Sequence, residues 1–124
     1  MTVNNMIVWV DIPVLDLDRA VAFYSTILGQ AVQKKSEHGF EFGLLPHDND
    51  NVSGCLCVMP DRKPSRDGFL VYLNVEGRLQ EAVEAARAMG QEILVEPEQV
   101  GPYGNRAVIL DTEGNALALY SKVV

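Results

Sequence analysis

Cysteine, histidine and tryptophan are rare in this chain. Its 124 residues include two cysteines, two histidines and a single tryptophan. Cys55 and Cys57 are separated by one residue, and a pair this close on one strand face cannot join distant parts of a fold through a disulfide bond. We expect both cysteines to be reduced and to act as small buried hydrophobic side chains.

The chain also lacks the features of membrane, secreted and nucleic-acid-binding proteins. No apolar run approaches the roughly 20 residues that span a bilayer, and Met1 to Asn5 has neither the basic region nor the apolar segment of a signal peptide. A net charge of −7 disfavours nucleic acids and anionic membranes as partners. We therefore expect a cytoplasmic protein with no nucleic-acid partner and no membrane partner.

Signatures of nucleophilic catalysis and of phosphate binding are missing as well. The sequence has no glycine-flanked serine elbow, no serine or cysteine with an evident histidine partner, and no glycine-rich phosphate loop. His38 and His47 are the only histidines, and both are predicted to be solvated residues of a turn and a loop. The sequence therefore identifies no catalytic residue.

Residues 7–29 have the pattern of a strand, a short loop and a helix. Alternation over residues 7–13 predicts a strand with Trp9 and Asp11 on one face and apolar side chains on the other. Asp16 is a typical N-cap for the helix that follows, whose apolar residues recur every three or four positions. Gly29 is expected to end this helix, because glycine adopts the left-handed conformation without a Cβ penalty.

The remainder of the chain repeats this pattern. A second amphipathic helix is predicted to stop at Gly90, and its Ala82-Val83 pair aligns with Ala20-Val21 of the first helix. The other predicted elements are strands at 30–35, 39–45, 52–59, 69–75, 91–96, 105–111 and 115–122, a loop at 46–51, and a linker at about 60–68. The pattern indicates a single domain over residues 1–124, built from one module at about 1–60 and another at about 69–124.

This order of elements, together with DLDRAVAFYSTILG at 16–29 and ILDTEGNALALYS at 109–121, resembles the vicinal oxygen chelate superfamily. That superfamily includes glyoxalase I, extradiol dioxygenases, and the bleomycin and fosfomycin resistance proteins. The resemblance implies an α+β fold in which two βαβββ modules form a cup-shaped mixed eight-stranded sheet, usually completed in a homodimer. It does not imply one activity, because isomerases, dioxygenases, transferases and metal-free drug binders share the scaffold.

The resemblance also implies where metal ligands would lie, and this sequence departs from that pattern. Metal-dependent members hold a divalent ion with histidine and glutamate side chains from the first and last strands of each module. The corresponding positions here fall on Trp9, Leu70 and Ala118, while residues 54–57 offer no carboxylate and only cysteine as a donor. Such an ion needs three or four ligands, so we expect no metal and no cofactor at these positions.

The same strand alternation predicts a largely apolar, aromatic-lined cup with a few polar groups, as in a small-molecule pocket. The residues expected to line it are Trp9, Asp11, Phe42, Leu70, Tyr72, Asn74, Tyr103, Arg106, Ala118 and Tyr120. Asp11 is expected to meet Arg106, a cation of the ligand or water, because a carboxylate is costly to bury without a partner. The alternative for the aromatic residues is packing in the core or in a dimer interface.

These observations favour a homodimeric, metal-free member of the superfamily. It is expected to bind a small, largely apolar organic molecule, either to sequester it or to act on it. One alternative is a divalent-metal-dependent lyase, isomerase or dioxygenase whose ligands have moved. Another is an interaction protein whose cup is closed by its own side chains.

Overall fold

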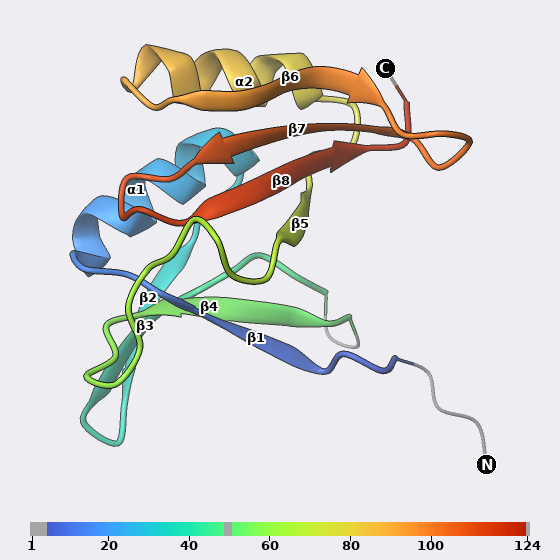
Figure 1. The fold of residues 1–124 in the computed structure, drawn as a ribbon. Coiled ribbons are helices and arrows are strands. Elements are labelled where there is room, and N and C mark those ends of the chain that lie inside the picture. The colour runs from blue at the N-terminus through green and yellow to red at the C-terminus, as the bar shows by residue number, and fades with distance from the viewer. Residues whose placement is uncertain (1–4, 49–50, 124) are drawn as a thin grey trace.

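The computed structural model describes residues 5–48 and 51–123, and in them two modules share the order strand, helix, three strands (Figure 1). The first module consists of β1 (Trp9–Pro13), α1 (Leu17–Leu28), β2 (Gln33–Glu37), β3 (Phe40–Leu44) and β4 (Ser53–Cys57). The second consists of β5 (Val71–Asn74), α2 (Leu79–Ala88), β6 (Ile93–Gln99), β7 (Asn105–Leu110) and β8 (Ala116–Ser121). The predicted α+β class and the two βαβββ modules are confirmed.

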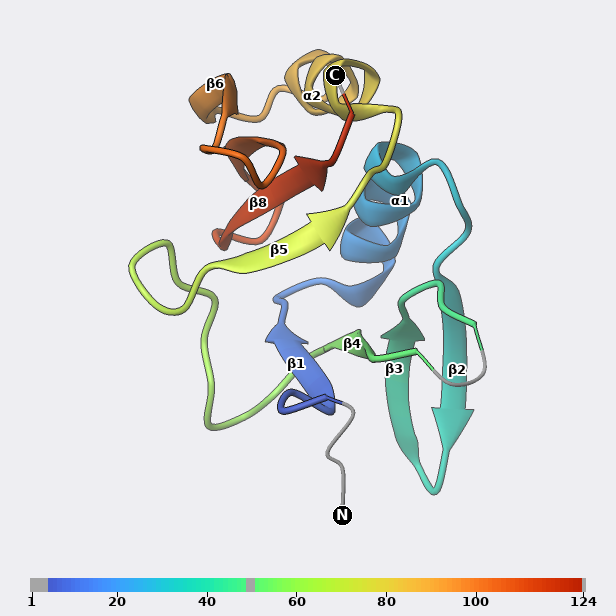
Figure 2. The ribbon, with the colours of Figure 1, turned by 90° about the vertical axis from the view of Figure 1, so that its right-hand side faces the viewer.

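Each module forms its own mixed sheet. The strand orders are β1-β4-β3-β2 and β5-β8-β7-β6, and in both sheets the first strand pairs in parallel with the last while the other pairs are antiparallel. Within the described residues, the eight strands are thus hydrogen-bonded as two four-stranded sheets rather than as one continuous sheet. β1 and β5 are edge strands of their sheets, and these two edges lie next to each other (Figure 2).

The helices form where the sequence predicts them. The Asp16 side chain accepts a hydrogen bond from Arg19 N at 3.1 Å, and Gly29 ends α1 in the left-handed conformation with φ 69°. α1 and α2 pack against each other, and α2 also packs on β6, β7 and β8. Their apolar faces meet the inner sides of the sheets, where a fully buried side chain such as Phe23 or Ile27 contributes roughly 1.5 to 3 kcal/mol.

Differences from the prediction are confined to element ends. β1 begins at Trp9, two residues after the expected Ile7, because its pairing with β4 starts with Trp9 opposite Ser53, and the side chains of Ile7 and Val8 are exposed. His38 and Gly39 join β2 to β3 as a tight turn in which both residues have positive φ, and His38 and His47 are exposed. Residues 60–68 contain neither helix nor strand, while residues 49–50 of the predicted loop lie outside the described residues.

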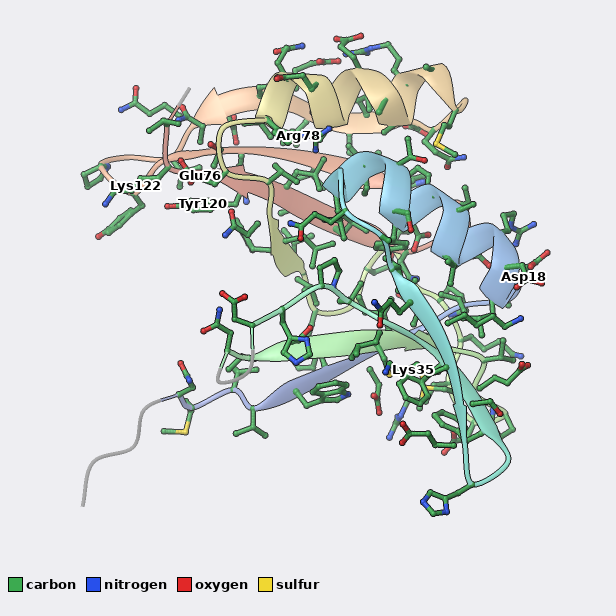
Figure 3. The ribbon with its side chains drawn as sticks, turned by 180° about the vertical axis from the view of Figure 1, so that it is seen from behind. Asp18, Lys35, Glu76, Arg78, Tyr120 and Lys122 are labelled. Carbon is green, nitrogen blue, oxygen red and sulfur yellow. The ribbon has the colours of Figure 1, made fainter. Side chains whose placement is uncertain are left out.

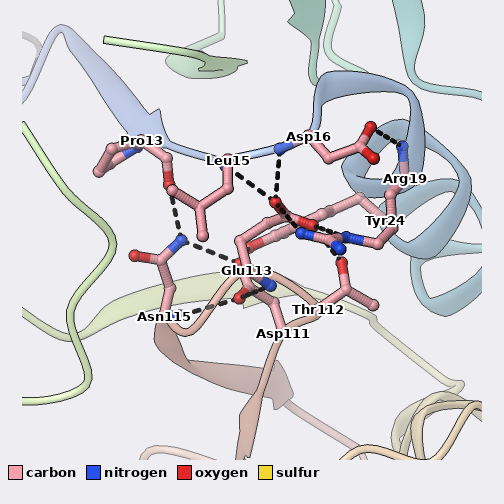
Figure 4. A network of polar contacts seen from close by, with 9 residues as sticks. All are labelled: Pro13, Leu15, Asp16, Arg19, Tyr24, Asp111, Thr112, Glu113 and Asn115. Atoms are coloured by element: carbon pink, nitrogen blue, oxygen red, sulfur yellow. Dashed lines mark hydrogen bonds and ion pairs between the residues drawn. The ribbon is translucent and has the colours of Figure 1, made fainter. Parts of the chain in front are cut away.

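A buried polar network joins the modules through the turn between β7 and β8 (Figure 4). The Glu113 carboxylate accepts hydrogen bonds from the backbone N–H groups of Leu15 and Asp16, both at 2.8 Å, and pairs with Arg19 at 2.7 Å. Beside it, Asp111 accepts a hydrogen bond from the Tyr24 hydroxyl at 2.6 Å. The turn of the second module is therefore attached to the start of α1.

A second connection lies at the other end of α1. The Arg78 guanidinium donates to the carbonyl oxygen of Ile27 at 2.9 Å, so a residue just before α2 satisfies a backbone acceptor at the C-terminus of α1 (Figure 3). No helix among the described residues is long and apolar enough to cross a membrane.

Candidate functional site

Strand alternation assigns the two faces of each sheet to different roles. On β1, Ile12 is buried in the core whereas Trp9 and Asp11 are exposed on the opposite face. On β8, Leu117 and Leu119 belong to the core, so Ala118 and Tyr120 point to the other face. The faces turned away from the core carry the residues that the sequence places in the cup, divided between the two sheets.

The residues of the first sheet form one group. Trp9 Nε1 donates to Asp11 Oδ1 at 3.0 Å, and the Cys55 thiol donates to the same oxygen at 3.4 Å. Cys57 lies next to this pair, and one donor atom from each of Asp11, Cys55 and Cys57 lies within 4.8 Å of the others. Phe42 stacks on Phe40 with ring centroids 5.8 Å apart.

Both thiols of this group are free and buried. Burial, followed by the neighbouring Cys57 and Asp11, raises the pKa of Cys55 to about 12. Burial and Asp11 also raise the pKa of Cys57. The prediction of two buried, reduced cysteines is confirmed, but no local pattern indicates that Asp11 lies against them.

The residues of the second sheet form a separate group. Arg106 donates to the Tyr72 hydroxyl at 2.6 Å and to the Glu98 carboxylate at 3.2 Å, and these hydrogen bonds raise the pKa of Arg106. The Tyr120 hydroxyl donates to the carbonyl oxygen of Tyr103. Asp11 does not pair with Arg106 in the structure, because each finds its partners within its own sheet.

The other expected residues have different surroundings. Leu70 is 38% exposed just before β5, whereas Ala118 is fully buried and offers no surface to a ligand. The Asn74 side chain accepts a hydrogen bond from Glu76 N at 2.9 Å and so stabilises the turn that leads to α2. The small Ala118 side chain lies between the larger Tyr72 of β5 and Val108 of β7, a pairing that a sequence pattern does not reveal.

A hollow of about 220 Å³ lies between β1 and β5, where the edges of the two sheets face each other. Of the residues predicted to line the cup, Asp11 alone lines this hollow. The other lining residues are Val10, Ile12, Pro13, Tyr24, Lys63, Ser65, Gly68, Phe69, Val71, Asn115, Ala116 and Leu117. Lys63, Ser65 and Gly68 come from the linker, and no local pattern shows that this segment returns to the seam between the sheets.

The metal ion that metal-dependent superfamily members carry does not fit the residues at the corresponding positions. Trp9 and Leu70 have no side-chain atom that binds a divalent ion, and Ala118 has none either. The side chains at these three positions therefore support no chemical step that uses a metal ion.

The structure is that of a small α+β protein built from two βαβββ modules, with aromatic and polar residues on the outward faces of its sheets. Comparison with known proteins identifies its family. Residues 6–119 match the glyoxalase/bleomycin resistance protein/dioxygenase superfamily. The chain therefore belongs to this superfamily.

Solved structures of similar fold cover nearly the whole chain. UcmS2 is 27% identical, with a TM-score of 0.66 and coverage of 95% of this chain and 98% of that one. A superfamily member from Sphaerobacter thermophilus is 21% identical, with a TM-score of 0.67 and coverage of 94% and 97%. The fosfomycin resistance protein FosX from Listeria monocytogenes is 18% identical, with a TM-score of 0.67 and coverage of 96% and 91%. A search of curated proteins found no significant match.

Proposed function

We propose that this protein binds a small, largely apolar organic molecule between its two sheets, either to sequester it or to act on it. The observation that carries the proposal is the hollow beside β1 and β5, which combines apolar walls with a few polar residues, among them Asp11 and Lys63. Pockets for small molecules have this composition, in which apolar walls supply affinity and a few polar groups orient the ligand. The volume of about 220 Å³ suits a ligand smaller than most drugs.

Exposed aromatic residues support the same proposal. Phe69 lines the hollow and is 100% exposed, while Trp9 and Tyr72 on the outward faces are 44% and 48% exposed. Leaving large apolar side chains in water has a cost that contact with a ligand or a second protein chain removes. The proposed ligand is neutral or cationic, because the chain carries a net charge of −7, whereas the hollow itself is lined by one acidic residue, Asp11, and one basic residue, Lys63.

The proposal assigns no metal ion to the superfamily's usual ligand positions. Its support is the set of side chains at Trp9, Leu70 and Ala118, none of which supplies the donors that such an ion needs. The proposed partners are the small molecule itself and a second copy of the chain.

Fluorescence of Trp9, the only tryptophan, tests binding, because the Trp9 indole N–H donates to Asp11, which lines the hollow. In a titration with a panel of neutral aromatic compounds and aromatic amines, we expect at least one compound to change the emission in a saturable way. Phe69→Ala should weaken the binding of that compound about tenfold, because the ligand loses contact with a phenyl ring. Since Phe69 is fully exposed, this substitution should leave the fold intact.

Met89→Ala is the matched control, because Met89 is also a partly exposed apolar residue but lies at the end of α2, outside the lining of the hollow. It should leave the affinity unchanged. A panel that neither alters Trp9 emission nor binds in isothermal titration calorimetry would favour an interaction protein over a small-molecule binder.

A further inference from the structure

Two cysteines and a carboxylate converge on the outward face of the first sheet. Cys55 and Cys57 are alternate residues of β4, so both thiols point to the same side, and Asp11 of the parallel neighbour β1 lies directly opposite Cys55. The three donor atoms lie within 4.8 Å of one another. Tetrahedral coordination with metal–ligand bonds of about 2.0 to 2.3 Å requires distances between the donor atoms that are somewhat shorter than 4.8 Å. Small movements of the side chains would bring the donor atoms to these distances.

The Asp11 carboxylate is held in a fixed orientation. Trp9 Nε1 and the Cys55 thiol both donate to Oδ1, and the structure gives no hydrogen bond to Oδ2 within the described residues. An indole N–H that orients a carboxylate in this way resembles the outer partners of metal ligands, which fix the orientation of the ligating group. Simple packing of two small hydrophobic side chains would not require a carboxylate against them.

Two members of the group are buried and the third is exposed, an arrangement that allows a metal ion to enter from solvent. Cys55 and Cys57 are 4% and 1% exposed, whereas Asp11 is at the surface, so an ion arriving from solvent meets the carboxylate first. Two thiols select soft or borderline cations over Mg²⁺, Ca²⁺ and Mn²⁺, which prefer oxygen ligands. Three protein ligands leave the fourth position of a tetrahedral ion for water or another small ligand.

We propose that Asp11, Cys55 and Cys57 form a binding site for a thiophilic divalent cation of the Zn²⁺ class, with one open coordination position. Binding replaces the two thiol protons with metal–sulfur bonds and releases these protons to solvent. The site lies within one module and uses none of Trp9, Leu70 and Ala118, although its two cysteines belong to residues 54–57, on a strand where the superfamily also places a ligand. It goes beyond the proposed binding of an organic molecule and does not depend on it.

Metal binding to the full chain under reducing, chelator-free conditions tests the site. We expect equilibrium dialysis to show one Zn²⁺ per chain, and Co²⁺ to give a thiolate-to-metal charge-transfer band and to quench Trp9 emission. Cys55→Ser and Cys57→Ser should each abolish or strongly reduce the charge-transfer band. Trp9→Phe keeps an aromatic ring but removes the N–H donor, and it should weaken Zn²⁺ binding about 10- to 100-fold.

Further variants separate a specific site from adventitious binding and from misfolding. Asp11→Asn changes an exposed residue, so its circular dichroism should match that of the parent protein while its Zn²⁺ affinity falls. Asp18→Asn and the double variant His38→Gln/His47→Gln alter exposed groups elsewhere and should bind Zn²⁺ like the parent protein. The proposal is overturned if no charge-transfer band forms, if the double variant Cys55→Ser/Cys57→Ser still binds Zn²⁺, or if the double histidine variant loses Zn²⁺ binding. None of these outcomes alters the fluorescence test with organic compounds, which is done on the metal-free protein.

Discussion

Glu113 has the most fully satisfied carboxylate among the described residues. It is 4% exposed, and it accepts hydrogen bonds from Arg19, from the Thr112 hydroxyl and from the backbone N–H groups of Leu15 and Asp16. A buried charge is costly unless its lone pairs are used in this way. Because these donors belong to both modules, the residue couples the turn between β7 and β8 to the start of α1 (Figure 4).

Replacing Glu113 should therefore destabilise the protein as a whole. We expect Glu113→Ala to lower the free energy of unfolding by about 2 to 4 kcal/mol, because two backbone N–H groups and Arg19 lose their acceptor. Glu96→Ala is the control, since Glu96 pairs with Arg87 at 2.9 Å but its side chain is 61% exposed. That substitution should cost no more than about 0.5 kcal/mol. Urea denaturation measures both changes, and equal losses would contradict the role assigned to Glu113.

The Glu113 carboxylate should also make the stability of the protein depend on pH. Burial alone would raise the pKa of Glu113, but the hydrogen bonds from Arg19, Thr112 and the backbone outweigh it and lower the pKa from 4.5 to about 2. The folded pKa lies below the unfolded one, so the stabilisation is complete above about pH 4.5 and is lost as the pH falls toward about 2. We expect Glu113→Gln to reduce the loss of thermal stability over this range. A parent protein and variant with parallel acid profiles would refute the assignment.

At the scale of elements, the pairing of β1 with β4 depends on a glycine. A Cβ atom at Gly54 would lie 2.2 Å from the carbonyl oxygen of Val10, so the two strands approach too closely for any other residue. This approach also brings Asp11 next to Cys55.

Gly54→Ala should force these strands apart. We expect it to lower the free energy of unfolding by about 1 to 3 kcal/mol, as overpacking commonly does. Gly68→Ala is the control, because a Cβ there would meet only Ser65 atoms at 3.8 Å or more. Chemical denaturation should separate the two variants, and a neutral Gly54→Ala would show that β1 adjusts its position without cost.

At the scale of the whole molecule, the seam between the sheets is incomplete. β1 and β5 each have one edge without a strand partner within residues 5–48 and 51–123, and unpaired edges favour association with another chain. Nearby apolar residues are also exposed, including Ile7 at 61% and Val8 at 75%. These features support the proposed homodimer.

Sedimentation equilibrium at micromolar concentration tests this proposal. We expect a mass twice the 13.6 kDa of one chain, because pairing of two copies covers the strand edges and the exposed apolar residues. A mass equal to that of one chain across the micromolar range would rule out a stable dimer.

Local signals in the sequence were sufficient to predict the helices, the strands and the two modules, whereas the arrangement of the strands into sheets was implied by the family resemblance. Asp16 and Gly29 mark the ends of α1 through the conformations that a cap and a left-handed glycine adopt, and the repeat of helix and strand patterns revealed the two modules. Alternation also placed Trp9 and Asp11 correctly on the outward face of β1. These features depend on residues close together in the chain.

Only the tertiary structure determined which side chains meet. Asp11 and Cys55 are 44 residues apart, and they touch because β1 and β4 are parallel neighbours rather than because of any local motif. Glu113 reaches Arg19 across 94 residues for the same kind of reason. Arg106, which the sequence offered as a partner for Asp11, instead pairs within the second sheet, since hydrogen-bond partners are selected by the packing of strands and not by charge alone.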